Sequence, residues 1–180
     1  MASNYAFIEP GGGFPSISNS GTFNTSGSGN QAPLAFGLIA GARDPTYGYA
    51  EFMFVAGPAA GTVGAGDAVL LLPNTVQQLV SGSTASQGAV GIAVTSLTAA
   101  SVWGWAQVQG VCDYAHLDTA GTGAVGAACF VGTTAGQLQT TAGATGYIIN
   151  GIKVSNYTTT AASKSAILNL YWPCYDGRNQ

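Results

Sequence analysis

Glycine and short turn motifs divide this chain into brief segments along its whole length. It has 180 residues, 27 of them glycine, and turn signals recur roughly every 8–12 residues, a spacing typical of β-sandwiches and barrels. Few windows have helical periodicity, and so many glycines would interrupt long helices; the stretch 96–101 is a candidate for one helical turn. The sequence therefore predicts an all-β fold, and closure into a barrel would hide strand edges that few charges protect.

The predicted strands are short runs that are rich in β-formers or alternate in polarity, and most of them end at Gly, Pro or Asn. They cover 49–56, 68–72, 75–80, 88–94, 102–111 with a continuation to 116 past a bulge at Gly110, 127–131, 137–140, 146–154 and 165–172.

Charged side chains make up only 6% of the chain, and the net charge is −3, whereas typical soluble domains carry about 25% charged residues. So few bases argue against direct binding of nucleic acid, which needs Lys and Arg to neutralise phosphates, and against a basic membrane-surface protein. No run approaches ~18 apolar residues, so we expect no membrane span. Because a weakly charged surface associates readily with other proteins, the composition favours a component of a large assembly.

The first 48 residues differ from the rest, and we predict an extended Gly/Ser-rich N-terminal arm over 1–48 followed by a β-barrel domain over 49–180. The arm carries isolated large apolar side chains that a pure linker would not need. We predict that Phe7, Phe14, Ile17 and Phe23 are anchors that dock on a neighbouring subunit and order on binding. A disordered terminus and an arm folded back on its own core are the alternatives.

The search for chemistry yields no catalytic, metal-binding or cofactor-binding residue, so we expect no enzyme and no cofactor. His116 is the single histidine; Asp113 and Asp118 flank it, but a metal site needs more converging ligands, and no G-x-S-x-G motif supplies a nucleophile. Three cysteines, Cys112, Cys129 and Cys174, form no CxxC pair and are interpreted as buried small hydrophobes, with a disulfide between two of them left open. The first residues lack the features of a secretory signal, so we expect folding in a cytoplasm with reduced thiols.

The tryptophans Trp103, Trp105 and Trp172 are large enough to organise a core or an interface. Trp103 and Trp105 are two residues apart on one predicted strand, so they share a face. We predict core or subunit-interface positions for all three, with an exposed ligand platform as the alternative.

About half of the chain, from Gly66 to Val154, resembles the head decoration, or cement, proteins of tailed bacteriophages. The matching segments run in the family's order: Gly66-Asp67-Ala68-Val69, Thr75 to Val80, Gly88 to Ala93, Trp103 to Val111, Ala120 to Gly126, Phe130 to Leu138 and Gly151 to Val154. The resemblance implies a β-barrel or β-tulip-like domain, commonly a homotrimer, that sits at quasi-three-fold positions and clamps major capsid subunits. It implies no catalytic residues.

We therefore expect a virion structural protein, a capsid decoration protein that binds across major capsid subunits and stabilises the shell. Its partners would be the major capsid protein and its own copies in a homotrimer, with neither nucleic acid nor membrane contacted directly, and the virion would assemble in the host cytoplasm. Two alternatives remain: another virion β-module, such as a tail or fibre protein, and a carbohydrate-binding β-sandwich.

Overall fold

The computed structural model describes residues 5–8, 13–25, 30–73, 75–80, 87–118, 124–140, 147–160 and 163–179, with the side chains of 156–160, 163–165 and 176–179 left out. Within these ranges the chain contains strands and no helix, which confirms the all-β class. The strands are β1 (Ala6–Phe7), β2 (Gly21–Thr22), β3 (Ile39–Asp44), β4 (Gly48–Ala56), β5 (Ala68–Leu72), β6 (Thr75–Gln78), β7 (Gly88–Ala93), β8 (Val102–His116), β9 (Ala128–Val131), β10 (Leu138–Gln139), β11 (Tyr147–Thr160) and β12 (Ser163–Asn179).

All twelve strands join one antiparallel sheet whose main path runs β1-β3-β4-β8-β7-β12-β11-β9-β10. β2 adds to β8, and the β5–β6 hairpin joins through β7. Because β1 and β10 end the path, the sheet is open and does not close into the predicted barrel. It branches instead, since β7, β8 and β12 pair with one another in all three combinations.

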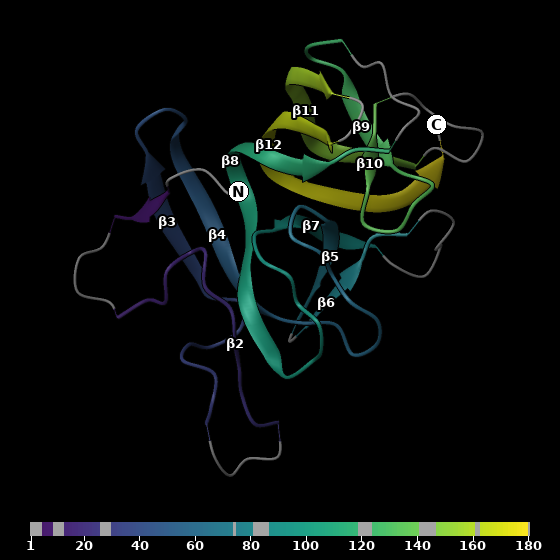
Figure 1. Ribbon diagram of the computed structural model, residues 1–180. Coiled ribbons are helices and arrows are strands. Elements are labelled where there is room, and N and C mark those ends of the chain that lie inside the picture. The colour runs from purple at the N-terminus through teal and green to yellow at the C-terminus, as the bar shows by residue number, and fades with distance from the viewer. Residues whose placement is uncertain are drawn as a thin grey trace.

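The long strand β8 connects the two halves of the sheet. Figure 1 shows it passing between the β3–β4 hairpin and the group formed by β9, β10, β11 and β12. Its first part pairs with β4, and its second part, from Gln109 to His116, pairs with β12. Gly110 lies where the two parts meet, with φ +94°, and a Cβ there would lie 2.6 Å from the carbonyl oxygen of Tyr49. The register against β4 shifts between Glu51 and Phe52, next to the predicted bulge.

The β3–β4 hairpin forms because its turn residues suit a tight reversal. One carboxylate oxygen of Asp44 accepts hydrogen bonds from the backbone N–H groups of Thr46 and Tyr47, at 2.6 and 2.9 Å, as in an Asx-turn. Gly48 then takes φ +80°, which glycine tolerates best. The predicted boundary at residue 48 therefore falls inside this hairpin, and β3, from the 1–48 segment, pairs with β4 along its whole length.

The main core lies on one face of the sheet, because large apolar side chains alternate along the strands with residues that point to the other face. Phe52 and Phe54 of β4 point inward, while Glu51 and Met53 between and beside them are only partly buried. The main cluster also includes Ile92, Trp105 and Leu168. A smaller cluster holds Val55, Val63, Val69, Val76 and Leu97, and because Val55 and Val69 alternate with main-cluster residues on β4 and β5, it lies on the opposite face of those strands.

The stretch 96–101 forms no helical turn. Leu97 is fully buried and pairs as an isolated bridge with Val63, with backbone hydrogen bonds in both directions. The burial of Leu97 fixes the backbone as extended, and a turn follows in which the Val102 N–H donates to the Ala99 carbonyl at 3.0 Å.

The three cysteines are unpaired. Cys112 and Cys129 are buried, as predicted, and burial raises the pKa of each thiol to about 12, which makes them poor nucleophiles at neutral pH. Cys174 differs from the prediction, because it is exposed. Within the described ranges, no helix is both long and apolar enough to span a bilayer.

Candidate functional site

The predicted anchor residues of the N-terminal segment contact this chain's own core. The ring of Phe7 lies 4.9 Å from that of Trp105 and 5.4 Å from that of Phe14. Ile17 is buried in the main cluster, and the ring of Phe23 lies 5.2 Å from that of Phe36.

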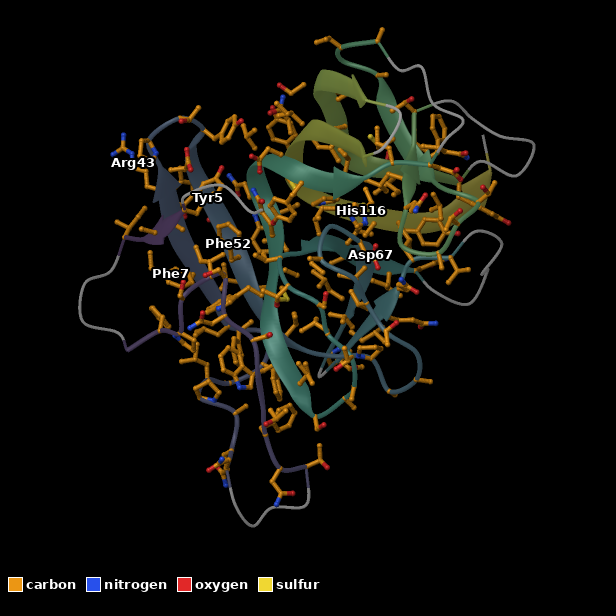
Figure 2. The ribbon with its side chains drawn as sticks, in the orientation of Figure 1. Tyr5, Phe7, Arg43, Phe52, Asp67 and His116 are labelled. Atoms are coloured by element: carbon orange, nitrogen blue, oxygen red, sulfur yellow. The ribbon has the colours of Figure 1, made fainter. Side chains whose placement is uncertain are left out.

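Tyr5 ties down the start of the described segment. Its hydroxyl donates to the carbonyl oxygen of Val111 at 2.8 Å, and its ring meets Phe52 edge-on at 5.3 Å. Figure 2 shows Tyr5, Phe7 and Phe52 on the same side of the molecule, around β3 and β4. Within one chain, the N-terminal segment is thus folded back on its own core. Docking on a neighbour through Phe7, Phe14, Ile17 and Phe23 would require these side chains to leave that core.

The tryptophans occupy two kinds of position. Trp105 is fully buried, and both Trp105 and Trp103 pack against Phe54, at 5.1 and 5.5 Å between ring centroids, so the two share a face as predicted. Trp172 is exposed, and its indole N–H donates to Oε1 of Gln109 at 2.8 Å. A ligand platform is therefore open to Trp172 alone among the three.

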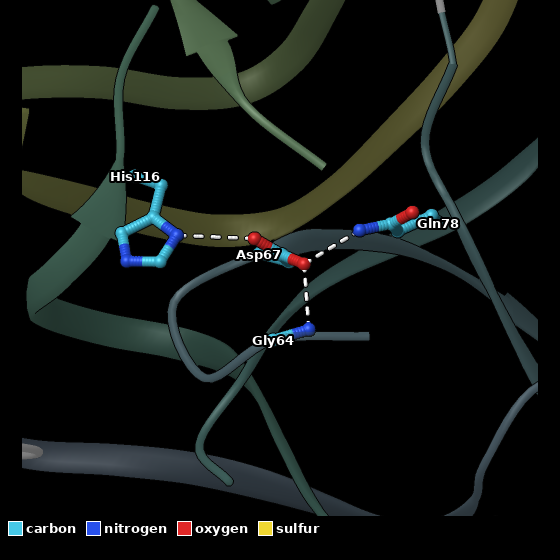
Figure 3. A network of polar contacts seen from close by, with 4 residues as sticks. All are labelled: Gly64, Asp67, Gln78 and His116. Atoms are coloured by element: carbon cyan, nitrogen blue, oxygen red, sulfur yellow. Dashed lines mark hydrogen bonds and ion pairs between the residues drawn. The ribbon is translucent and has the colours of Figure 1, made fainter. Parts of the chain in front are cut away.

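The carboxylate of Asp67, in the turn before β5, joins several segments of the chain (Figure 3). Its Oδ1 lies 3.0 Å from Nδ1 of His116, at the end of β8. Its Oδ2 accepts from the backbone N–H of Gly64 at 2.6 Å and from Nε2 of Gln78, on β6, at 2.7 Å. One carboxylate therefore holds a turn, a hairpin and the end of the long strand β8 together.

Two glycines allow these segments to approach so closely. A Cβ on Gly66 would lie 2.4 Å from the carbonyl oxygen of Tyr114, and one on Gly136 would lie 2.7 Å from Cγ of Asp67. Both glycines have positive φ, +90° and +75°, so a larger residue would be strained at either position as well as crowded.

The electrostatics of Asp67 favour its ionised form. Burial by itself raises the pKa of this carboxyl, but the hydrogen bonds from His116, Gln78 and Gly64 outweigh burial, and the net pKa lies below the ordinary value of 3.8. A carboxyl with a lowered pKa is a poor general acid at neutral pH. Its chemistry here is that of a fixed hydrogen-bond acceptor and ion-pair partner.

The His116–Asp67 pair has the base and orienting groups of a hydrolytic triad but not its third member. Such a triad needs a hydroxyl or thiol hydrogen-bonded to the imidazole, and the recorded hydrogen bonds of His116 in the described chain include none of that kind. The same described residues contain no group of three or more His, Cys, Asp and Glu that could hold a metal. The geometry fits a polar cross-link between strands.

A second cluster lies on the outer face of β4, β8 and β12; we call it the aromatic face. It consists of Tyr49, Gln109, Asn169, Tyr171 and Trp172, with Gly110 at its centre. The rings of Tyr49, Tyr171 and Trp172 are 47%, 62% and 41% exposed. Sequence reasoning singled out Trp172 but missed both tyrosines and the partner of His116.

We compared the chain with known proteins. No protein-family model, no curated protein and no solved structure matches it.

Proposed function

We propose that this chain is a structural component of a virus shell, a capsid decoration protein that binds across major capsid subunits. The described polar network supports a non-catalytic role, because it cross-links strands and presents no nucleophile to His116. The low charge of the chain, 6% of residues, suits a surface that neighbouring proteins cover.

The observation that carries this proposal is a pair of exposed isoleucines at the edge of the sheet. Ile8 follows β1, and its N–H donates to the carbonyl of Gly41 at 3.1 Å, which places Ile8 on the same face as Ile39. Both side chains are exposed. The two-residue strand β1 is the terminal strand of the path, and an exposed sheet edge with apolar side chains is a ready docking site for another polypeptide.

The effect on the shell would be thermodynamic. A protein that binds only where capsid subunits meet stabilises the assembled state by mass action, without new covalent bonds. A homotrimer at the quasi-three-fold positions, as the resemblance of residues 66–154 implies, would multiply each contact three-fold by symmetry.

The test is cryo-electron microscopy of the particles whose genome encodes the chain, combined with re-addition to particles stripped of it. We expect density for the chain over boundaries between capsid subunits. The double variant Ile8→Ser/Ile39→Ser should bind stripped particles at least about tenfold more weakly, because it removes two apolar contacts. Val125→Ser, another exposed apolar position, is the matched control and should bind as the unchanged chain does.

Two results would overturn the proposal. One is a chain that is absent from the particle and is recovered only as a free monomer. The other is equal particle binding by the double variant and the control, which would show that this sheet edge is not the docking element.

A further inference from the structure

The aromatic face is built by a distortion of β12. Trp172 has φ +50°, the only positive value for a non-glycine residue in the described chain. Opposite it, β11 and β12 lose register between Asn150 and Ile152, where Gly151 alone faces the stretch from Tyr171 to Pro173. A bulge of this kind redirects side chains, and here it sends two consecutive aromatic residues outward.

Tyr49 and Tyr171 border an open surface, and Trp172 is joined to it through Gln109. A depression of about 150 Å³ is lined by Tyr49, Tyr171, Asn169 and Gln109, with Gly110 among its lining residues. At Gly110, the φ of +94° and the close approach of Ala50 on β4 exclude a larger residue. The tight packing of β4 against β8 therefore depends on this glycine.

Polar groups accompany the rings on this face. The carboxylate of Glu51 accepts from the Tyr49 hydroxyl at 2.9 Å. The Oε1 of Gln109 accepts from Trp172 at 2.8 Å, which fixes the amide and leaves its N–H₂ group as a donor for a ligand. Asn169 supplies a second amide at the rim.

We propose that the aromatic face is a saccharide-binding site for β-linked oligosaccharides of glucose-type pyranoses. The electron-rich face of an aromatic ring attracts C–H groups, and a pyranose with equatorial hydroxyls offers a flat C–H face with hydroxyls around its edge. Exposed rings together with amides and a carboxylate match both parts of that ligand.

The charges around the face argue against single-stranded nucleic acid, whose bases also stack on aromatic rings. Arg43 lies opposite Tyr49 in the β3–β4 register, and Lys153 lies opposite Asn169 in the β11–β12 register. Glu51 lies opposite Gln109, and two bases partly offset by acids are too few to neutralise a phosphate backbone. A protein hot spot would place its rings in an apolar, desolvated centre, whereas two amides share this face with the rings.

The test is saturation-transfer NMR with cellohexaose and chitohexaose as probes, followed by titration calorimetry of the full chain. We expect saturation to reach the sugar ring protons from the aromatic region. Tyr171→Ala and Trp172→Gly should each weaken binding about tenfold. Glycine suits the φ of residue 172, so this variant removes the indole without adding backbone strain. Leu72→Ala, an exposed apolar position off this face, should bind as the unchanged chain does.

Any of three outcomes would overturn the inference: no binding of either hexasaccharide at millimolar concentration, unchanged affinity in both aromatic variants, or preferential binding of oligo-dT. The outcome is independent of shell binding, because the isoleucine variants of the sheet edge leave the three rings in place.

Discussion

His116 and Asp67 are joined at 3.0 Å between Nδ1 and Oδ1 although 49 residues separate them in the chain. The contact links the end of β8 to the turn before β5 (Figures 2 and 3). Since Gln78 and Gly64 bond to the same carboxylate, Asp67 is the hub of this contact between segments.

Replacing Asp67 by Asn should destabilise the fold. The substitution keeps the shape of the side chain but removes the charge that His116 faces, and it replaces one of the two accepting oxygens by an N–H₂ group that cannot accept a hydrogen bond from the former donor. We expect the free energy of unfolding to fall by about 1–3 kcal/mol, measured by urea denaturation. Glu51→Gln, a more exposed carboxylate with one hydrogen bond from Tyr49, should change it by less than about 0.5 kcal/mol; equal losses in the two variants would contradict the role of Asp67.

The same carboxylate predicts how stability responds to acid. Its pKa in the folded chain is lower than the value of 3.8 for the free group, so ionised Asp67 favours folding above that value and the benefit is lost as pH falls through the folded pKa. The stability difference between the natural chain and Asp67→Asn should therefore shrink between about pH 5 and pH 2. Thermal denaturation at a series of pH values measures it, and a difference that stays constant over this range would count against the prediction.

Gly136 should tolerate alanine less well than Gly126 does. Both have positive φ, +75° and +85°, but a Cβ on Gly126 meets nothing within 4 Å, whereas one on Gly136 would lie 2.7 Å from Cγ of Asp67. Gly126→Ala should cost about 1 kcal/mol for the backbone alone. Gly136→Ala should cost at least about 1 kcal/mol more because Asp67 has to move. The free energies of unfolding of the two variants test this prediction. Equal losses would show that Asp67 can shift without loss of stability.

Phe7 and Ile8 provide a matched pair for the N-terminal segment. Phe7→Ala removes the ring contacts with Trp105 and Phe14 and should lower the free energy of unfolding by about 1–3 kcal/mol. It should also speed proteolytic cleavage before residue 25. Ile8→Ala, at an exposed side chain, should stay within about 0.5 kcal/mol. Rapid cleavage of the unchanged chain at the same sites would mean that the segment is not held by Phe7.

Much of the strand pattern could be predicted from local sequence. The prediction 68–72 matches β5 at both ends, because an apolar run there lies between a Gly-Asp turn and a proline. β11 and β12 extend beyond their predicted ranges, since Thr- and Ser-rich segments lack apolar alternation and are extended by pairing with each other. Open or closed topology depends on which distant strands pair, and local patterns do not contain that information.

The candidate sites were harder to predict for the same reason. His116 was weighed against its sequence neighbours Asp113 and Asp118, but its partner comes from another turn. The Gly66-Asp67 turn was recognised, yet no local pattern shows which group will meet the carboxylate. Trp172 was flagged by size alone, and its outward position results from a bulge opposite Gly151 that depends on pairing between two strands.

The three-way pairing of β7, β8 and β12 affects the order in which the chain can fold during synthesis. β12 is the last of the twelve strands to leave the ribosome, yet it contacts β7 and β8, made roughly half a chain earlier. Until it emerges, β7 and β8 can pair with β5, β4 and each other, but the residues that pair with β12 lack that partner. Nascent chains of this kind expose unpaired, aggregation-prone sheet edges during synthesis. Abundant expression would therefore depend on chaperones that shield β7 and β8 until translation reaches β12.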